Sequence, residues 1–569
     1  IKQVAEYFKE RGFKRHFIQR KGTPGYSEDI PRVLADYTVG LAGYMSRLRS
    51  VTAMKKAAVN IDARANPDLA DYTSKYIQYL ENPTNEASGF RSMLFMYYLG
   101  GNVKSAALNL TQPMTTTYPY LTKFANDAVV AKEMVFASRL AVKKAASLPK
   151  DLAVAVKKAE DIGVISEQYT DELRGKAKGQ VLARSGTYWK ALKVFSYLFG
   201  KAENFNRRVT FISSFNIAKR LQAQGKPLPP ETPTPFEMAV RAVEDTQFSY
   251  GTFNRPPVGR GAIGATVLTF RTFMINYLEL FRDIPAPQKA RMLAVLGTLA
   301  GATGVPFADD LKNIIEWTVN KMGYHLDMEH EARKFMAEIS DDPAYADVVL
   351  HGTTRLTPWY LGGSISLGDI LPEPEGAGPY FGPFSKVVGP AANFIERPIG
   401  AYELYQKGQT GRAAERLLPE ALRNALVAKR FAEEGARDLS GRLMYTPTKA
   451  EIAGKALSFQ PSGLARTYER KEAERKTVGY KRDQSEIFYA RLTRALFKGD
   501  DKEIQRTFND IKKYNASVSP EFIFIPNKAV LKMKLQEMLL DESLAGIRGI
   551  PKALRAKILQ ERALYGVGR

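Results

Sequence analysis

Helical spacing of apolar residues runs through this 569-residue chain and constrains its fold more than any other feature. Large apolar side chains recur three, four or seven positions apart, which places them on one face of an α-helix. Four such rows are Tyr188, Leu192, Phe195 and Phe199; Phe270, Phe273, Met274, Tyr277, Leu278 and Phe281; Phe488, Leu492 and Leu496; and Leu531, Leu535 and Met538. The alternation typical of strands is scarce, and residues 522–525 are its best example. We therefore predict an all-α fold, an elongated assembly of many helices.

Residues at the expected helix ends support this prediction. Thr448 and Glu451 have the spacing of a capping box, and Thr446 followed by Pro447 offers an alternative helix start. Three glycines each follow a helical run and are predicted to end it: Gly435, Gly441 and Gly499.

Two proline-rich interruptions suggest boundaries. Prolines in residues 224–236 forbid a continuous helix, so we predict a linker there. Residues 358–398 are rich in Gly and Pro, but they hold too many aromatic residues for a flexible linker. We expect an extended segment that packs on a helical surface or enters a neighbouring subunit. The predicted regions are an N-terminal helical region 1–223, the linker 224–236, a central helical region 237–357, the extended segment 358–398 and a basic helical region 399–569.

The first residues are basic and amphipathic, and the chain starts with Ile1 rather than Met. They lack the charged and apolar halves of a secretory signal. We expect the sequence to be the ordered part of a longer protein.

Charge and cysteine content narrow the functions. Lys and Arg number 83 against 60 acidic residues, a formal net charge of +23. Such an excess favours a polyanionic partner, namely nucleic acid, anionic lipid or an acidic protein surface, although a generally basic surface is the alternative. Cysteine is absent, which excludes disulfides, thiolate catalysis and cysteine-bound metal centres.

Residues 292–308 form an uncharged stretch. As a helix it would be about 25 Å long, short of the roughly 30 Å hydrocarbon core of a bilayer. Gly297 and Gly301 have the spacing of close helix contacts in membranes. We favour a buried core helix ending near Pro306 and keep conditional insertion into a membrane as the alternative. The candidate membrane-contact residues are Met292, Leu293, Val295, Leu296 and Leu299.

Catalytic motifs are weak throughout. Residues 259–264 match the dinucleotide-binding letters, but the prolines at 256 and 257 exclude the strand that the motif needs, so a turn before a helix is predicted. His325 and His330 are five positions apart and miss the zinc-protease spacings. Neither a phosphate-binding loop lysine nor a nucleophile elbow occurs. Glu542 followed by Ser543 resembles the start of a transglycosylase site, but nothing around it completes a sugar cleft. We predict no catalytic residue, metal or cofactor.

Seven stretches carry a resemblance to a known family: residues 16–37, 100–121, 201–215, 246–281, 304–317, 349–372 and 456–475. In this order they resemble the C-terminal regions of very large phage polyvalent proteins, which are similar to the internal virion (ejection) proteins of short-tailed phages. One departure is that relatives carry Pro-Leu-x-Arg-Phe-Gly where residues 256–261 read PPVGRG.

The resemblance implies a protein that is packed inside the capsid, leaves ahead of the genome and reassembles across the host envelope as a conduit for DNA. It implies a homo-oligomer with DNA and other ejection, portal or tail proteins as partners, and the host inner membrane as a further candidate. The expected locations are the capsid interior and then the host periplasm and inner membrane. Enzymatic modules of such proteins usually lie elsewhere in the long polypeptide.

We therefore expect a non-enzymatic ejection protein. The candidate DNA contacts are Lys55, Lys56, Arg207, Arg208, Arg255, Arg260, Arg466, Arg470 and Lys471, the last three within a basic run at 466–482. For Arg207 and Arg208 the alternative is pairing with Glu203, one turn earlier on the same helix. Two other functions stay open: the accessory region of a giant injected polymerase or nuclease, and a membrane-permeabilising protein.

Overall fold

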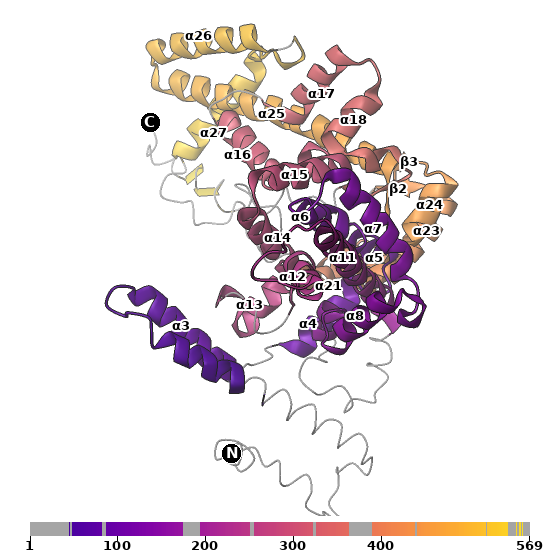
Figure 1. Ribbon diagram of the computed structural model, residues 1–569. Helices are drawn as coiled ribbons and strands as arrows, with labels where there is room; N and C mark the ends of the chain where they lie inside the picture. The colour runs from indigo at the N-terminus through magenta and orange to yellow at the C-terminus, as the bar shows by residue number, and fades with distance from the viewer. Residues whose placement is uncertain are drawn as a thin grey trace, which may run out of the picture. The chain divides into compact units, whose positions relative to one another are not determined.

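Helices dominate this computed structural model, which confirms the predicted all-α fold (Figure 1). The structure describes residues 48–81, 87–173, 194–250, 257–321, 326–362, 390–438, 441–518 and 520–543, with residues 45, 255, 554, 557, 558, 560 and 561. Tyr188, Leu192, His325 and the predicted amphipathic opening segment lie outside these residues, as does the first stretch of the family resemblance.

The chain divides into two compact units: residues 1–311 with 347–462, and residues 312–346 with 463–569. The predicted boundaries differ from these, because the chain leaves the first unit and later returns to it. The helices of the first unit are α3 (Pro67–Glu81), α4 (Ser88–Tyr98), α5 (Val103–Asn109), the π-helix η2 (Pro113–Thr117), α6 (Tyr118–Leu121), α7 (Asp127–Ala141), α8 (Lys150–Asp161), α9 (Gln168–Leu173), α11 (Tyr197–Ala223), α12 (Pro235–Gln247), α13 (Gly261–Val267), α14 (Thr272–Asp283), α15 (Ala286–Ala300), α21 (Pro390–Gln406), α22 (Thr410–Leu417), α23 (Glu420–Glu434) and α24 (Lys449–Ala456).

The long helix α11 lies at the centre of the first unit, where α5, α7 and α12 pack around it (Figure 1). One apolar cluster joins α11 to α7, α8 and α12, and a second joins its far end to α6, α14 and α15. Because both clusters draw on α11, its side chains are buried on nearly every face from Gly200 to Ala218.

The proline-rich stretch 224–236 is not a boundary between domains. It ends α11, and the Thr234–Glu237 capping box with Pro235 at the first helical position then starts α12. Since α11 and α12 pack in one core, the prediction of a linker between two regions is wrong. Proline forbids helix continuation here, but it does not prevent the two helices from packing together.

The second unit contains α17 (Met328–Ile339), α26 (Asp501–Ser517), α27 (Lys528–Ser543) and most of α16 (Ala308–Lys321) and α25 (Ser462–Lys498). Gly499, at φ +65°, ends α25, and Asp500 caps α26 by accepting a hydrogen bond from the Glu503 amide. The two helices form a hairpin whose core includes Phe488 and Ile511.

The expected strand at residues 522–525 is absent from the described part of this unit. A short 3₁₀ turn spans Pro520–Phe522 instead. The Asn515 side chain of α26 donates to the Phe524 carbonyl and accepts from the Phe524 amide. These bonds satisfy the backbone in place of a neighbouring strand.

Strands are short and few among the described residues. β1 (Trp359–Tyr360) pairs with β4 (Gln460–Pro461), and β2 (Ala436–Arg437) pairs with β3 (Leu443–Tyr445), both antiparallel. The glycine cap predictions hold at Gly435 and Gly499, whereas Gly441 lies in the β2–β3 turn and ends no helix. The Thr448–Glu451 capping box is present at α24.

The predicted extended segment 358–398 is only partly described. Residues 363–389 lie outside the described residues. Residues 390–398 belong to α21, so the extended prediction is wrong for them. Pro398 inside α21 explains why the sequence favoured an interruption there.

Candidate nucleic-acid interface

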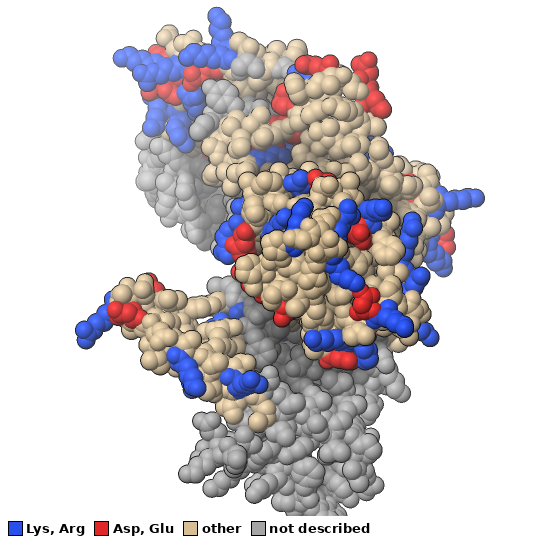
Figure 2. Space-filling view, in the orientation of Figure 1, with Lys and Arg blue, Asp and Glu red and all other residues tan. Residues whose placement is uncertain are grey.

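A row of basic side chains follows one face of α26, and sequence reasoning missed it. Lys502, Arg506 and Lys513 are exposed and form no ion pair with a described residue. At 100° per residue they fall within an arc of about 40°, and they extend over about 16 Å of helix. The buried side chains of α26, Thr507, Ile511 and Tyr514, lie on the opposite side. Figure 2 shows Lys and Arg side chains standing out around α26.

The two acidic residues beside this row, Glu503 and Asp510, share one partner cation. Arg491 of α25 donates to Glu503 at 2.9 Å through Nη2 and to Asp510 at 2.9 Å through Nη1. Bonding to both carboxylates also raises the pKa of the Arg491 guanidinium. Glu503 and Asp510 lie between the basic row and the core of the hairpin. The row therefore faces outward, with one of these two negative charges offset by Arg491, while Asp500 and Asp501 are exposed beside its first cation.

The neighbouring helix adds two cations to the same side of the hairpin. Arg494 and Lys498 of α25 are exposed and follow Arg491 by about one and two turns. On both helices, these cations lie farther from the core of the hairpin than the bridge that Arg491 forms with Glu503 and Asp510. We call these five side chains the basic hairpin surface: Arg494, Lys498, Lys502, Arg506 and Lys513.

The predicted basic run at 466–482 lies on α25, but several of its cations are engaged. Arg470 pairs with Glu474 at 3.7 Å, and Lys476 donates to Glu316 at 3.2 Å. Arg466 is exposed and Lys471 is half-buried. Positive and negative side chains alternate along this part of α25. It therefore attracts a polyanion less strongly than its number of Lys and Arg residues suggested.

Arg207 does not meet a partner outside the protein. Its side chain is 1% exposed, and its guanidinium donates to the carbonyls of Phe248 at 2.7 Å and Gln247 at 3.2 Å. Nε lies 3.6 Å from Glu203, so the alternative pairing on α11 is confirmed and the DNA-contact prediction is wrong. The reason is that α11 is surrounded by packed helices, which the sequence did not reveal.

The Glu203 carboxylate accepts several hydrogen bonds inside the protein, just as the Arg207 guanidinium donates several. It accepts hydrogen bonds from the Tyr169 amide at 2.7 Å, the Thr170 amide at 3.2 Å and the Thr170 hydroxyl at 3.0 Å. Burial raises the pKa of the Glu203 carboxyl and lowers that of the Arg207 guanidinium, because each charge has lost its water. The pair therefore holds α9 against α11 as a structural element.

The other predicted DNA contacts in the first unit differ in how exposed they are and in whether they already have a partner. Arg208 is half-buried and donates to the Lys143 carbonyl at 3.0 Å, and Arg255 is buried, so the contact prediction is wrong for Arg255. Arg260 is half-buried over the Tyr79 ring at 4.5 Å. Lys55 is exposed and pairs with Glu81, whereas Lys56 is exposed without a described ion pair.

The predicted membrane-contact residues belong to α15. Met292 and Leu296 are buried in the core of the first unit, and Leu293, Val295 and Leu299 are half-buried. The favoured core helix is thus confirmed, but its predicted end near Pro306 is wrong. The helix ends at Ala300, where Gly301 at φ +71° approaches the backbone of Leu350 too closely for any side chain. Among the described residues, no helix combines the length and apolar character needed to cross a bilayer.

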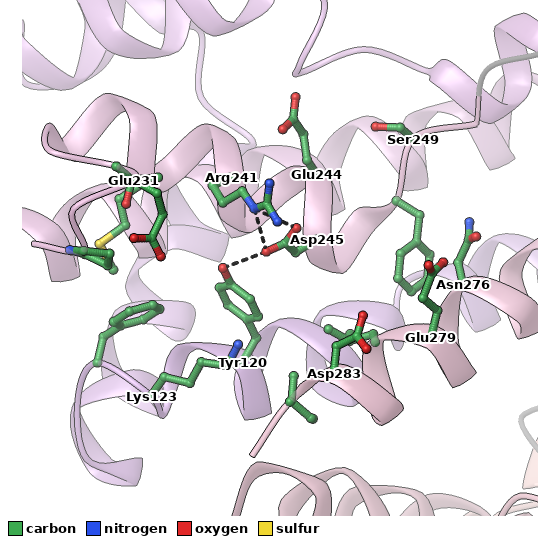
Figure 3. A pocket seen from close by; sticks show the side chains of 17 residues that line it. Tyr120, Lys123, Glu231, Arg241, Glu244, Asp245, Ser249, Asn276, Glu279 and Asp283 are labelled. Atoms are coloured by element: carbon green, nitrogen blue, oxygen red, sulfur yellow. Dashed lines mark hydrogen bonds and ion pairs between the residues drawn. The ribbon is translucent and has the colours of Figure 1, made fainter. Parts of the chain in front are cut away.

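An acidic pocket of about 1200 Å³ opens between α6, α12 and α14 (Figure 3). Acidic side chains outnumber basic ones in its lining, with Glu231, Glu244, Asp245, Glu279 and Asp283 against Lys123 and Arg241. Asp245 is held by the Tyr120 hydroxyl at 2.9 Å and by Arg241 at 3.0 Å. Burial raises the pKa of the Glu244 carboxyl. Such a lining repels polyanions, so we exclude this pocket from the nucleic-acid interface.

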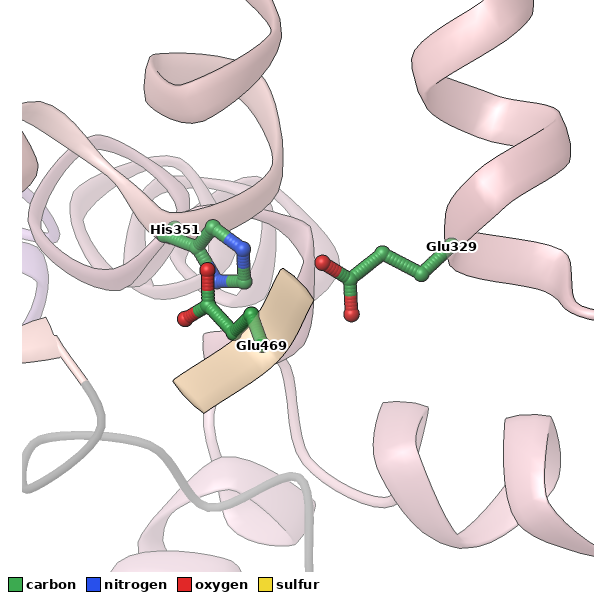
Figure 4. A group of neighbouring side chains, drawn as sticks. All are labelled: Glu329, His351 and Glu469. Carbon is green, nitrogen blue, oxygen red and sulfur yellow. The ribbon is translucent and has the colours of Figure 1, made fainter. Parts of the chain in front are cut away.

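Two other sequence features have structural roles. The dinucleotide-like letters at 259–264 lie at the end of a 3₁₀ turn and the start of α13, which confirms the predicted turn before a helix. Glu329 of α17 and Glu469 of α25, both drawn in Figure 4, share Arg333 at 3.2 and 3.6 Å. His351, the third side chain in that figure, belongs to the other unit and ends α18 (Pro343–His351). The backbone amide of His330 donates to Asp327, which caps α17.

Comparison of the chain with protein-family models, with curated proteins and with solved structures finds no match, so its function is argued from its own residues.

Proposed function

We propose that this protein is a non-enzymatic internal virion protein of a short-tailed phage, which contacts DNA through the basic hairpin surface of α25 and α26. The observation that carries the proposal is the exposed row of Lys502, Arg506 and Lys513, beside which Arg491 bonds to Glu503 and Asp510. The resemblance in sequence supplies the place of action: the capsid interior, and then the host envelope.

Contacts of this kind suit DNA of any sequence. Lys and Arg that neutralise phosphates release condensed counterions, and the affinity then depends on salt and not on bases. A protein that escorts a whole genome has to tolerate every sequence in it. The basic hairpin surface offers charge along one helix face, and such charge contacts phosphates, which carry no sequence information directly.

A conduit also requires contacts between copies of the chain. The described helix α21 carries an exposed apolar row, Ile395, Ile399 and Tyr402, at the i, i+4 and i+7 positions of one face. Exposed apolar side chains that share a face are typical of subunit contacts. We include self-association through this row in the proposal, and sedimentation of Ile399→Asp tests it. If the unsubstituted protein stays monomeric, even with partner virion proteins present, the proposed self-association is contradicted.

The DNA contact is tested by measuring binding of the full chain to a labelled duplex at several salt concentrations. Replacing Lys502, Arg506 and Lys513 together with Gln is expected to weaken binding about 100-fold at 0.1 M salt, because about three phosphate contacts are lost. The matched control replaces Lys132, Lys144 and Lys150 with Gln. These residues are exposed cations of the first unit, and their removal changes the net charge equally.

The two variants separate a local interface from overall charge. Equal losses in both would show that the net charge of +23 drives binding without a defined surface, and the proposal would fail. An unchanged affinity in the α26 variant would also remove it. Mass spectrometry of purified virions tests the biological setting, and absence of the polypeptide from the particle contradicts it.

A further inference from the structure

A second pocket lies in the first unit, beside the buried Glu203–Arg207 pair, and nothing above uses it. Its volume is about 500 Å³, within the range of sites that hold small molecules. The lining is mainly apolar and aromatic, with Phe199, Phe270, Phe273 and Leu296 among its side chains. Leu296, predicted to contact a membrane, thus faces a cavity inside the protein.

Two polar atoms that line this pocket, or belong to residues that line it, lack partners. Tyr277 is 1% exposed, and its hydroxyl has no hydrogen-bond partner. The amide nitrogen of Asn109 is also buried without a partner, although the Asn109 side-chain oxygen accepts from Asn206 at 3.3 Å. Buried polar groups in native proteins are almost always satisfied, so two orphaned donors at one cavity indicate a missing acceptor.

The surroundings favour an uncharged acceptor. Burial alone raises the pKa of the Tyr277 phenol, which means that its hydroxyl lies in an apolar environment. The one carboxylate of the lining, Glu203, is already bound by Arg207 and by the amides of Tyr169 and Thr170. A charged ligand group beside Tyr277 would lose its water. Arg271 is the one cation among the lining residues, so an anionic ligand must be tested directly.

The local backbone supports a binding site. The π-helix η2 supplies Thr115 to the lining, and Gln112 precedes it. Gln112 donates to the Thr246 carbonyl at 3.1 Å, which ties η2 to the end of α12. Single π-helical turns within helices often accompany functional sites. The hydrogen bond of Gln112 therefore fixes a polar part of the lining, to which aromatic rings are added.

We propose that this pocket binds a neutral, mainly apolar molecule with a carbonyl oxygen, the chemistry of a fatty acyl ester, and that Tyr277 and Asn109 donate to that oxygen. The apolar chain packs against the phenylalanines and Leu296. The proposal does not depend on DNA binding, and its two donors lie outside the basic hairpin surface.

The test uses methyl decanoate as the probe and the full chain as the protein, with binding measured by ligand-observed NMR. Tyr277→Phe keeps the ring and removes only the hydroxyl. Since that hydroxyl is unpartnered in the free protein, Tyr277→Phe is expected to leave the unfolding temperature unchanged or higher while it weakens methyl decanoate about fivefold. A hydroxyl with a purely structural role would lower the unfolding temperature instead.

Further arms fix the ligand class. Decanoate, which carries a charge, is expected to bind more weakly than its methyl ester, and tighter binding of decanoate overturns the neutral class. Leu108→Phe fills the pocket and is expected to abolish binding. Incubation with phosphatidylcholine vesicles followed by native mass spectrometry shows whether a phospholipid supplies the acyl ester. The proposal is overturned if methyl decanoate does not bind, or if it binds Tyr277→Phe as tightly as the unchanged protein. DNA affinity is measured on Tyr277→Phe as well, and an unchanged value keeps the two proposals separate.

Discussion

Two helices, α11 and α26, both carry basic residues, yet they use them in opposite ways. On α11, Arg207 is enclosed with Glu203 and bonded to backbone carbonyls. On α26, Arg506 is exposed with no described ion pair, because Arg491 occupies the nearby carboxylates. The difference follows from how many faces of each helix are covered. A helix packed on all sides turns its cations into structural parts, whereas a helix packed on one side leaves them for a partner.

The largest effect is expected from breaking the buried pair. Arg207→Ala leaves the Glu203 carboxylate buried without its cation and should lower the free energy of unfolding by about 3–5 kcal/mol. Chemical denaturation of the full chain measures this. Combining Arg207→Ala with Glu203→Ala should recover part of the loss, because no unpaired charge remains. If Arg207→Ala were as stable as the unchanged protein, the structural role of the buried pair on α11 would be contradicted.

The second effect is a pH dependence at another buried cation. Burial, aided by the nearby Arg423, lowers the pKa of Lys455 from 10.5 to about 8. Below pH 8 the folded and unfolded chains both keep the proton. Between pH 8 and 10.5 only the unfolded chain holds it, so stability rises with pH, by at most about 3 kcal/mol.

Denaturation midpoints across that pH range test the prediction. Lys455→Met should remove the rise, whereas Lys513→Met on the exposed face of α26 should leave it in place. A rise of the same size in Lys455→Met would assign the titration to a different group.

The third effect sharpens the α26 side of the comparison. Arg491→Gln leaves every cation of the basic hairpin surface in place but frees Glu503 and Asp510. Their repulsion of phosphates should weaken DNA binding about tenfold, or about 1.4 kcal/mol. Adding Glu503→Gln and Asp510→Asn should restore the affinity. Failure of this rescue would mean that Arg491 acts through the fold of the hairpin rather than through charge.

The smallest effect concerns one exposed cation. Arg506→Gln should change the free energy of unfolding by less than about 0.5 kcal/mol, as for most surface substitutions. The slope of log affinity against log salt should become shallower by about 1. A stability loss comparable to that of Arg207→Ala would erase the contrast between the two helices.

Local sequence patterns predicted the secondary structure well. The apolar rows predicted helices, Thr448 with Glu451 predicted a cap that is present, and the prolines near 257 predicted the turn that precedes α13. These features depend on residues within one turn of each other. The predicted strand at 522–525 was wrong because the side chain of Asn515, nine positions earlier on α26, satisfies the backbone amide and carbonyl of Phe524.

The site was harder to predict, and the reason is burial. Arg207 and Arg506 both lie on helices that carry charges of each sign, and packing encloses the first and exposes the second. The one-sided apolar pattern of α26, with Thr507, Ile511 and Tyr514 opposite the cations, was available in the sequence and could have identified the basic row. The bridge from Arg491 to Glu503 and Asp510 could not have been predicted from the sequence, since it depends on the angle between the two helices of the hairpin.

By itself, the sequence determined that this protein is helical, free of cysteine and strongly cationic, because composition and short-range periodicity carry those properties. Tertiary structure alone decided that Arg207 is enclosed, that Arg491 bridges two residues of the next helix, and that Tyr277 and Asn109 line one cavity. Those outcomes depend on contacts between different helices and loops, such as Arg491 with Asp510, 19 positions apart, and Arg207 with Phe248, 41 positions apart. Hydrophobic burial selects such contacts for the whole chain at once, so no local pattern records them.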